Sequence, residues 1–412
     1  MNLSQRLRKE FSFFRGNYAI IVLSWILMDF AMELPGTYYA LYVLNLGATE
    51  TILGMIGFAS FLVLAAVQFP GGYLADKFGR RWLVSSMTFG VAFCYILFAI
   101  APSWHFILLG AVLMSLCLIY QPALLSMVAD SVPSERRGMG FGIIMLITSA
   151  STTPGPLVAG ILYNQFGLDL GMRIGYGIVV ASFFVAAFLR LLLQETLISN
   201  PRRPSFNEIV RSYPVALKES FGVWKKLHPS MFYVFLSGVV GTFGFAAAQL
   251  YFVVYAVEEL HIDKAVWPLI LTVLFVTMIA LAVPMGKVVD KFNRKVPILV
   301  AYVLMGVAML LFVYGDLLRL LVSLVLVGVA QTMMNAAFGA LQTDLTPKAQ
   351  RGKVTGCMNF ANNILMALGS LTGGILYEHV HPQVPFFLAL LFTIPPFIIT
   401  LALVHEPQKR EE

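Results

Sequence analysis

The sequence reads Gly72-Tyr-Leu-Ala-Asp76-Lys77-Phe-Gly79-Arg80-Arg81 at residues 72–81, and a related stretch, Gly286-Lys-Val-Val-Asp290-Lys291-Phe-Asn-Arg294-Lys295, follows 214 residues later. Each copy comes at the end of one long apolar run and directly before the next. A charged turn repeated between hydrophobic segments indicates a membrane protein built from two related halves. Proteins of this kind are typically transporters, because the interface between the halves forms a pathway.

The same offset relates positions well outside the charged stretches. Residues 130–138 and 344–352 share an Asp, a Pro, an Arg and a Gly at matching places, and Gly160-Ile-Leu-Tyr163 returns as Gly374-Ile-Leu-Tyr377. A single offset that relates matching residues in both helices and loops is not expected to arise by chance. The pattern therefore predicts parallel repeats related by an axis along the membrane normal.

The composition is that of a membrane protein. Of the 412 residues 59% are hydrophobic and 12% are charged, whereas soluble chains carry about 25% charged residues. A membrane-spanning helix needs about 20 apolar residues, and twelve runs meet this need: 17–44, 51–75, 82–102, 104–129, 138–164, 170–194, 229–257, 264–289, 296–315, 317–343, 352–378 and 383–404. The runs are continuous rather than alternating, which favours helices over barrel strands. We expect an all-α membrane protein of twelve transmembrane helices in two pseudo-symmetric six-helix bundles.

The net charge of +7 is unevenly distributed. With the amino terminus placed inside, all of the 28 Lys and Arg residues except Arg173, Lys264 and Arg319 fall on the inner side. This asymmetry predicts a multi-pass protein of the cell membrane with both termini in the cytoplasm. It also explains the basic residues better than nucleic-acid binding does, so no nucleic-acid partner is expected.

The polar stretch between the halves divides the chain into three parts. We assign residues 1–195 to an N-terminal six-helix bundle, 196–228 to a cytoplasmic linker and 229–412 to a C-terminal six-helix bundle. Apolar residues at helical spacing in the linker suggest a short helix lying in the inner interface. Because three prolines interrupt the stretch, an unstructured loop is an equal alternative.

The first charged stretch carries a resemblance to a known family. It satisfies the pattern Gly-x-x-x-Asp-(Arg/Lys)-x-Gly-x-(Arg/Lys)-(Arg/Lys) that follows the second helix of the major facilitator superfamily, and the similarity extends over essentially the whole chain. The resemblance implies secondary transport by alternating access. The glycines would permit close helix contacts between the halves, and the charges would form ion pairs that hold the inner side shut in one state. The alternative is that these charges only set the topology. The predicted gating residues are Gly72, Asp76, Lys77, Gly79, Arg80, Arg81, Asp130, Arg137, Gly286, Asp290, Lys291, Arg294, Asp344 and Arg351.

The fifth predicted helix contains Thr153-Pro154-Gly155-Pro156-Leu-Val-Ala-Gly160, which resembles the Gly- and Pro-rich element of the family's proton-coupled drug antiporters. Pro154, Gly155, Pro156 and Gly160 would bend the helix and allow a thin contact with a neighbour. Two features depart from that pattern. Ala159 stands where a second glycine is common, and residues 104–129 lack the basic residue on which the antiporters' proton relay is built.

Asp29 and Glu33 lie inside the first apolar run, followed by Pro35 and Gly36. Their spacing of four puts both on one helix face, one turn apart. Ionised carboxylates are costly in hydrocarbon, and two like charges oppose each other's ionisation, so the pair is a candidate proton-coupling site beside a helix break. The alternative is that Glu33 caps the broken helix and Asp29 bonds a polar neighbour. At the offset of 214 stand Phe243 and Ala247, so the second half does not copy the pair.

Other polar or aromatic residues fall deep within the runs. As a set they suggest an uncharged cavity wall, although a hydrogen bond between helices explains each one singly. The predicted substrate-binding residues are Tyr38, Tyr120, Gln121, Gln249, Gln331, Asn335, Asn359 and Asn363. No Arg or Lys lies clearly at mid-span, so cationic or neutral amphipathic substrates fit better than phosphates or di-acids.

No signal for an enzyme, cofactor or metal was found. The three cysteines lie in apolar runs and the six histidines near their ends, and the sequence has no phosphate-binding Gly-x-x-x-x-Gly-Lys, no His-Glu-x-x-His and no Gly-x-Ser-x-Gly motif. We expect a monomeric secondary transporter that couples proton entry to export of small amphipathic compounds, as in multidrug efflux. Proton-coupled uptake of a neutral solute such as a sugar is the alternative, and a non-transporting sensor on the same scaffold is a third class.

Overall fold

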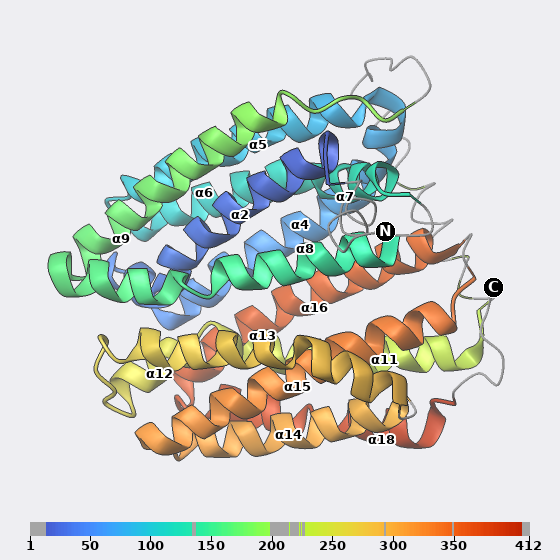
Figure 1. Cartoon of the computed structure of the whole chain (residues 1–412). Coiled ribbons are helices and arrows are strands. Elements are labelled where there is room, and N and C mark those ends of the chain that lie inside the picture. Colours follow the sequence, from blue (N-terminus) through green and yellow to red (C-terminus); the bar gives the residue numbers. More distant parts are fainter. Residues whose placement is uncertain are drawn as a thin grey trace, which may run out of the picture.

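A computed structural model describes residues 14–133, 137–197, 227–291, 294–347 and 350–405, together with positions 214, 222 and 224. Within this part of the chain every regular element is helical. Figure 1 shows two bundles side by side, one coloured blue to green and the other yellow to red. The predicted fold of two six-helix bundles is confirmed. We call the end of the molecule where α2 begins and α18 finishes the terminal end, and the opposite end the far end.

The bundles are built from consecutive helices. The first contains α2 (Asn17–Gly36), α3 (Tyr39–Asn45), α4 (Glu50–Phe78), α5 (Arg80–Ala99), α6 (Trp104–Cys117), the 3-10 turn η1 (Leu118–Tyr120), α7 (Gln121–Ser131), α8 (Arg137–Thr152) and α9 (Gly155–Arg190). The second contains α11 (Pro229–Gln249), α12 (Phe252–Glu258), α13 (Trp267–Lys291), α14 (Lys295–Val313), α15 (Leu317–Asp344), α16 (Arg351–His379), α17 (Val384–Leu391) and α18 (Ile394–Leu403).

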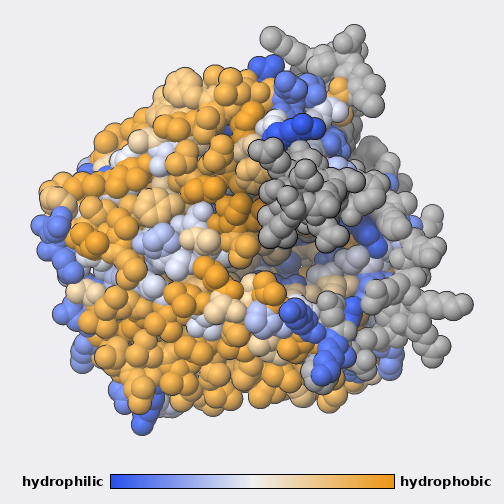
Figure 2. Space-filling view, in the orientation of Figure 1, coloured by the Kyte–Doolittle hydropathy of each residue, from blue (hydrophilic) through white to orange (hydrophobic). Residues whose placement is uncertain are grey.

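Ten segments of the described chain are long and apolar enough to cross a membrane. One of them, Gly142–Arg190, holds two crossings, because the chain turns within α9 at Gly167, whose φ of 73° suits glycine. Helix α16 is more polar than the ten, since it carries three asparagines, yet it packs along α4. Together these account for the twelve predicted crossings. Apolar residues cover most of the face seen in Figure 2, and hydrophilic residues gather at its two ends.

The first and seventh crossings are both broken, and the breaks correspond. Helix α2 ends at Gly36 and α3 begins at Tyr39, whereas α11 ends at Gln249 and α12 begins at Phe252. Both boundaries differ by 213 residues rather than 214. Within these two crossings the counterparts of Asp29 and Glu33 are therefore Thr242 and Ala246, which corrects the pairing with Phe243 and Ala247.

The bundles meet along two seams, α4 against α16 and α9 against α13. At the first seam the backbones are very close: a Cβ on Gly57 would lie 2.0 Å from Ser370 Oγ, and one on Gly54 would lie 2.6 Å from the Ser370 carbonyl oxygen. Glu378 of α16 also accepts a hydrogen bond from the Thr51 backbone N–H at the start of α4, at 2.8 Å. These contacts lie toward the far end.

Several predicted features fall outside the described residues. They are most of the linker at 196–228 and the side chains of Asp76, Lys77, Arg137 and Asp290, together with the surroundings of Gly72.

Candidate transport site

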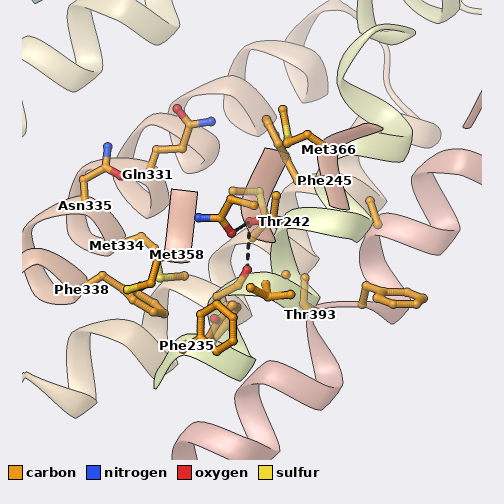
Figure 3. Close-up of a pocket in the computed structure, with 18 of the residues that line it drawn as sticks. Phe235, Thr242, Phe245, Gln331, Met334, Asn335, Phe338, Met358, Met366 and Thr393 are labelled. Carbon is orange, nitrogen blue, oxygen red and sulfur yellow. Dashed lines mark hydrogen bonds between the residues drawn. The ribbon is translucent and has the colours of Figure 1, made fainter. Parts of the chain in front are cut away.

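A cavity of about 570 Å³ opens within the second bundle, between α11, α14, α15, α16 and α17. Figure 3 shows how methionine, phenylalanine, amide and threonine side chains surround it. Its lining includes Phe235, Thr242, Phe245, Met305, Met309, Gln331, Met334, Asn335, Phe338, Met358, Asn359, Asn362, Met366, Phe392 and Thr393. Among the described residues that line it, none carries a formal charge. The cavity extends to Gln342 and Thr355, close to where α15 ends and α16 begins at the terminal end.

The polar groups of this cavity are only partly engaged. Thr242 Oγ1 lies 3.3 Å from Asn362 Oδ1, and Gln342 Nε2 donates to Thr355 Oγ1 at 2.9 Å. The side-chain amides of Gln331, Asn335 and Asn359 form no hydrogen bond to any other residue that the structure describes. Donors and acceptors of these three predicted binding residues are thus available to a ligand, beside polarizable methionines that adapt to different shapes.

A smaller cavity of about 210 Å³ lies between the bundles, next to the first. Phe245 and Gln331 line both cavities, and Gln249 lines the smaller one. Its first-bundle wall contains Gly36 and Thr37, at the break between α2 and α3. The two neighbouring cavities therefore lie between the core of the second bundle and the helix that carries the two acids.

Glu33 lies close to the smaller cavity. Its carboxyl Oε2 would be 3.7 Å from a Cβ on Gly36, which lines the smaller cavity. The hydroxyl of Thr37 donates to the Glu33 carbonyl at 2.8 Å, so the backbone of Glu33, and not its carboxylate, stabilises the helix end. Asp29 is half-buried one turn away. Neither carboxyl group is hydrogen-bonded to another residue in the described part of the chain.

The Pro–Gly element of the fifth crossing meets Glu33 directly. The chain breaks between Thr152, where α8 ends, and Gly155, where α9 begins. A Cβ on Gly155 would lie 2.4 Å from the Cβ of Glu33, so only glycine fits there. Further along, Gly160 faces Pro268 of α13 across the second seam, with a Cβ-to-Cγ distance of 3.1 Å. Two features that are far apart in the sequence thus form one site.

The second bundle contains the same packing without the acid. Gly369, the counterpart of Gly155, would place a Cβ 2.7 Å from the Cβ of Ala246, the counterpart of Glu33. This contact supports the offset of 213 within the first and seventh crossings. It also means that an alanine is sufficient to pack against the glycine.

The charged turns form ion pairs within each bundle. Arg80 pairs with Asp130, and Arg294 Nε lies 3.5 Å from Asp344 Oδ2. Both pairs connect positions related by the offset of 214, and each brings together helices of a single bundle, rather than joining one bundle to the other. Arg81 Nη2 donates to the Leu191 carbonyl at 2.8 Å.

The remaining predicted gating residues are placed as follows. Arg351 donates to the carbonyls of Thr343 and Thr346, and Gly79 has a φ of 96° at the turn between α4 and α5. Lys291 is exposed at the end of α13. Gly286 has open space around it, with no heavy atom within 4 Å of a Cβ built there. It therefore makes no close contact with the opposite bundle in this state.

Four predicted binding residues line neither the large cavity nor the smaller one between the bundles. Gln121, Gln68 and Asn363 form a chain of amides across the first seam, with hydrogen bonds of 3.5 and 3.0 Å. Tyr38 is buried near the far end, where its hydroxyl donates to the Lys264 carbonyl at 2.7 Å. Tyr120 is buried inside the first bundle.

Arg190 is a buried cation, although the charge distribution of the sequence predicts it on the inner side with the other basic residues. It is 0% exposed. Its Nε and Nη1 donate to Ser24 Oγ at 3.0 Å and Thr88 Oγ1 at 2.8 Å, and its guanidinium carbon lies 5.4 Å from the centre of the Tyr120 ring. Its Nη2 is buried without a hydrogen-bond partner, and no described carboxylate lies within 4 Å of it. The leucines at 191–193 continue the apolar run past Arg190, and this continuation was the feature of the sequence that pointed to its burial.

Two bundles joined at seams, with an amphipathic cavity reaching the interface, define a membrane transporter rather than an enzyme. The sequence profile of the Major Facilitator Superfamily matches residues 21–257 and 234–412. The chain belongs to this family.

Similar proteins include multidrug resistance protein MdtG of Citrobacter koseri, 24% identical over 88% of this chain and 87% of that protein. A Na(+), Li(+), K(+)/H(+) antiporter of Planococcus maritimus is 28% identical, but the match spans only about a third of each chain, 35% in both cases. The crystal structure of the nucleoside transporter NupG superposes with a TM-score of 0.74 at 14% identity, covering 94% of this chain and 99% of that one. This last likeness supports the fold alone.

Proposed function

We propose that the protein exports small amphipathic compounds, cationic or neutral, across the cell membrane in exchange for protons. The cavity in the second bundle would bind the substrate, and Asp29 and Glu33 in the first would carry the protons. The observation that carries the proposal is the uncharged lining of methionines, aromatic rings and free amides, next to a smaller cavity whose wall includes Gly36, one turn from Glu33. Such linings suit ligands that vary in shape, and aromatic faces attract cations.

The comparison of the bundles supports a functional role for Glu33. Ala246 packs against Gly369 as Glu33 packs against Gly155, so the contact itself does not require a carboxyl group. Asp29 likewise corresponds to the uncharged Thr242. Acids inside the membrane are costly and are normally retained for a function. Proton binding is the function that a pair of adjacent carboxyl groups beside a transport route fits best.

In the proposed mechanism the bundles rock about the fixed sites. We place the terminal end in the cytoplasm, because the sequence assigns nearly all Lys and Arg residues to the loops of that side. The bundles then touch at the outer side, and the large cavity reaches Gln342 and Thr355 on the inner side, so this is an inward-open state ready to take up substrate. Protonation of Asp29 and Glu33 from outside, and release inside, would favour the return step. A single chain suffices for this cycle.

Proton-coupled uptake of a neutral solute such as a sugar is the second candidate. The free amides of Gln331, Asn335 and Asn359 favour it, since they offer paired donors and acceptors to hydroxyl groups. The methionines and phenylalanines of the same cavity fit a polar solute less well.

Flux measurements in proteoliposomes test the proposal. For exchange, a lumen more acidic than the bath should drive ethidium, an aromatic cation, into the lumen, whereas symport would drive a neutral disaccharide inward when the bath is the more acidic side. The double variant Asp29→Asn/Glu33→Gln should lose the gradient-driven component. Glu259→Gln, which changes an exposed acid on the far end, should retain it. Unchanged gradient-driven flux in the double variant would rule out the proton role.

A further inference from the structure

Two tyrosines connect the bundles at the far end. Each follows a helix break: Tyr38 lies between α2 and α3, and Tyr251 between α11 and α12. The hydroxyl of Tyr38 donates to the carbonyl of Lys264 in the second bundle at 2.7 Å. In the reverse direction, the hydroxyl of Tyr251 donates to the carbonyl of Glu50 in the first bundle at 3.1 Å. Both side chains are almost fully buried, with 2% and 0% of their surface exposed.

The two acceptors are equivalent positions of the repeat. Glu50 and Lys264 differ by the offset of 214, and both lie where the next crossing begins: Glu50 is the first residue of α4, and Lys264 comes three residues before α13. The donors Tyr38 and Tyr251 differ by the 213 that holds for the first and seventh crossings. One hydrogen bond is thus present twice, related by the pseudo-symmetry of the fold.

Each donor ring also lies on a second tyrosine of its own bundle. The centroids of Tyr38 and Tyr163 are 5.3 Å apart, and those of Tyr251 and Tyr377 are 5.1 Å apart. Tyr163 and Tyr377 close the repeated Gly-Ile-Leu-Tyr sequences. Ring contacts of this kind fix the position of the donor hydroxyl.

The glycines of the same repeated sequences allow the approach. A Cβ on Gly374 would lie 2.6 Å from the Glu50 carbonyl oxygen and 2.8 Å from the Tyr251 hydroxyl. Gly160 is its counterpart and faces Pro268, in the first turn of α13. The repeated sequence therefore has one local purpose in both bundles: a glycine admits the partner helix, and a tyrosine three residues later supports the donor ring.

We propose that Tyr38, Tyr163, Tyr251 and Tyr377 form a duplicated outer gate. The gate closes the far end when both hydroxyls bond across the bundles, and it opens when both bonds break. Trp267 completes the closure, since its Nε1 donates to the Thr37 carbonyl at 3.2 Å and its ring lines the smaller cavity. The gate therefore separates that cavity from the far side. The inference depends on alternating access but on neither the substrate nor the coupling ion.

The test measures conformation without substrate, so that it is independent of transport. In a background with the native cysteines replaced, spin labels at Gln165→Cys and Val380→Cys, both exposed near the far end, report the distance between the bundles by double electron–electron resonance. Tyr38→Phe and Tyr251→Phe keep each ring and remove one hydroxyl. Since a hydrogen bond contributes about 1 kcal/mol, each change should raise the ratio of far-end-open to closed molecules about fivefold, and the double variant should raise it further.

The chain supplies matched controls four residues later. Tyr42 donates to the Phe98 carbonyl at 3.2 Å and Tyr255 to the Val313 carbonyl at 3.0 Å, each within its own bundle. Tyr42→Phe/Tyr255→Phe should leave the ratio unchanged. Gly374→Ala leaves all four tyrosines in place, but its added Cβ would displace the Tyr251 hydroxyl from the Glu50 carbonyl. This variant should open the far end as Tyr251→Phe does. The gate is refuted if the Tyr38→Phe/Tyr251→Phe variant opens the far end no more than the control pair does. If proton-driven ethidium flux alone fails, the proposed function is contradicted but the outer gate is not.

Discussion

At the scale of single residues, Arg190 is the least expected feature. A buried cation without a carboxylate in contact is costly, and replacing buried charges by apolar groups of similar volume is often neutral or stabilising. Its two hydroxyl partners already donate to carbonyls of their own helices, Ser24 to Ile21 at 2.7 Å and Thr88 to Val84 at 2.6 Å. Loss of the guanidinium would therefore leave neither hydroxyl without an acceptor. We infer that Arg190 is retained for its charge.

Arg190→Met is accordingly expected to keep or raise the melting temperature in detergent while proton-driven ethidium flux falls to near background. Arg190→Lys, which keeps the charge, should retain part of the flux. A melting temperature that falls steeply in Arg190→Met, with flux per folded molecule unchanged, would mean that the role of the residue is structural. Thermal unfolding and flux measured on the same preparation distinguish the two outcomes.

At the scale of elements, the seam between α4 and α16 depends on a missing side chain. Gly57 admits the hydroxyl of Ser370, and this serine also donates to the Gly54 carbonyl at 3.3 Å. The atoms nearest to a Cβ on Gly57 belong to the side chains of Ser370 and Leu250, whereas one turn earlier, at Gly54, they include backbone of α16, which holds the two helices close. Close contact of this kind requires small residues on both helices.

Gly57→Ala should therefore lower the free energy of unfolding by about 1–3 kcal/mol, the usual cost of overpacking. Adding Ser370→Ala removes the colliding Oγ, and the double variant should regain part of the loss. Gly142→Ala and Gly356→Ala are suitable controls, since each glycine faces open space, and they should have little effect. Equal losses in the single and double variants would contradict this account of the seam.

At the scale of the whole molecule, the contacts between the bundles and the large cavity lie toward opposite ends. The hydrogen bonds between the bundles that involve described residues run from Gln68 and Asn363 toward the far end. The large cavity extends the other way, to Gln342 and Thr355. The contacts between the bundles and the large cavity thus lie toward opposite ends, which is the arrangement that the proposed alternating access requires.

A cysteine inside the cavity should consequently react from one side only. In a background with the native cysteines replaced, Asn359→Cys should be modified by a membrane-impermeant thiol reagent in inside-out vesicles and be protected in right-side-out vesicles. Ethidium present during labelling should slow the reaction. Equal labelling from both sides would contradict either the assigned orientation or the closed outer side.

Much of the fold was predictable because its signals are local. Continuous apolar runs, the repeated turn at residues 72–81 and 286–295, and the common offset defined the helices and the two bundles. The pair Asp29 and Glu33 stood out because acids are rare in such runs. Their contact with Gly155 could not be foreseen, since it depends on how the first and fifth crossings pack.

The remaining features depend on contacts between distant segments. From the sequence alone, Arg190 looks like an ordinary cation at the end of a helix, and only the structure shows that it is buried. The sequence of the charged turns likewise does not show that Arg80 and Arg294 form ion pairs within their own bundles. Gln331 and Asn335 were identified as polar residues, but only the packed bundle shows that they share one cavity. The change of the repeat offset from 214 to 213 could not be detected in the sequence, because the first and seventh crossings have little sequence in common.

The alanine that faces Gly369 has a consequence for the electrical properties of the carrier. If the titrating acids occupy one bundle and the substrate the other, protons and substrate do not compete for the same atoms. The two binding events must then be coupled through a conformational change rather than through direct exchange at one site. The transmembrane voltage would then act on the acids of one bundle and on a cationic cargo in the other. Glu33→Ala with Ala246→Glu leaves Asp29 in the first bundle but would place one titrating acid in the bundle that binds the cargo, and we expect the voltage dependence of transport to change.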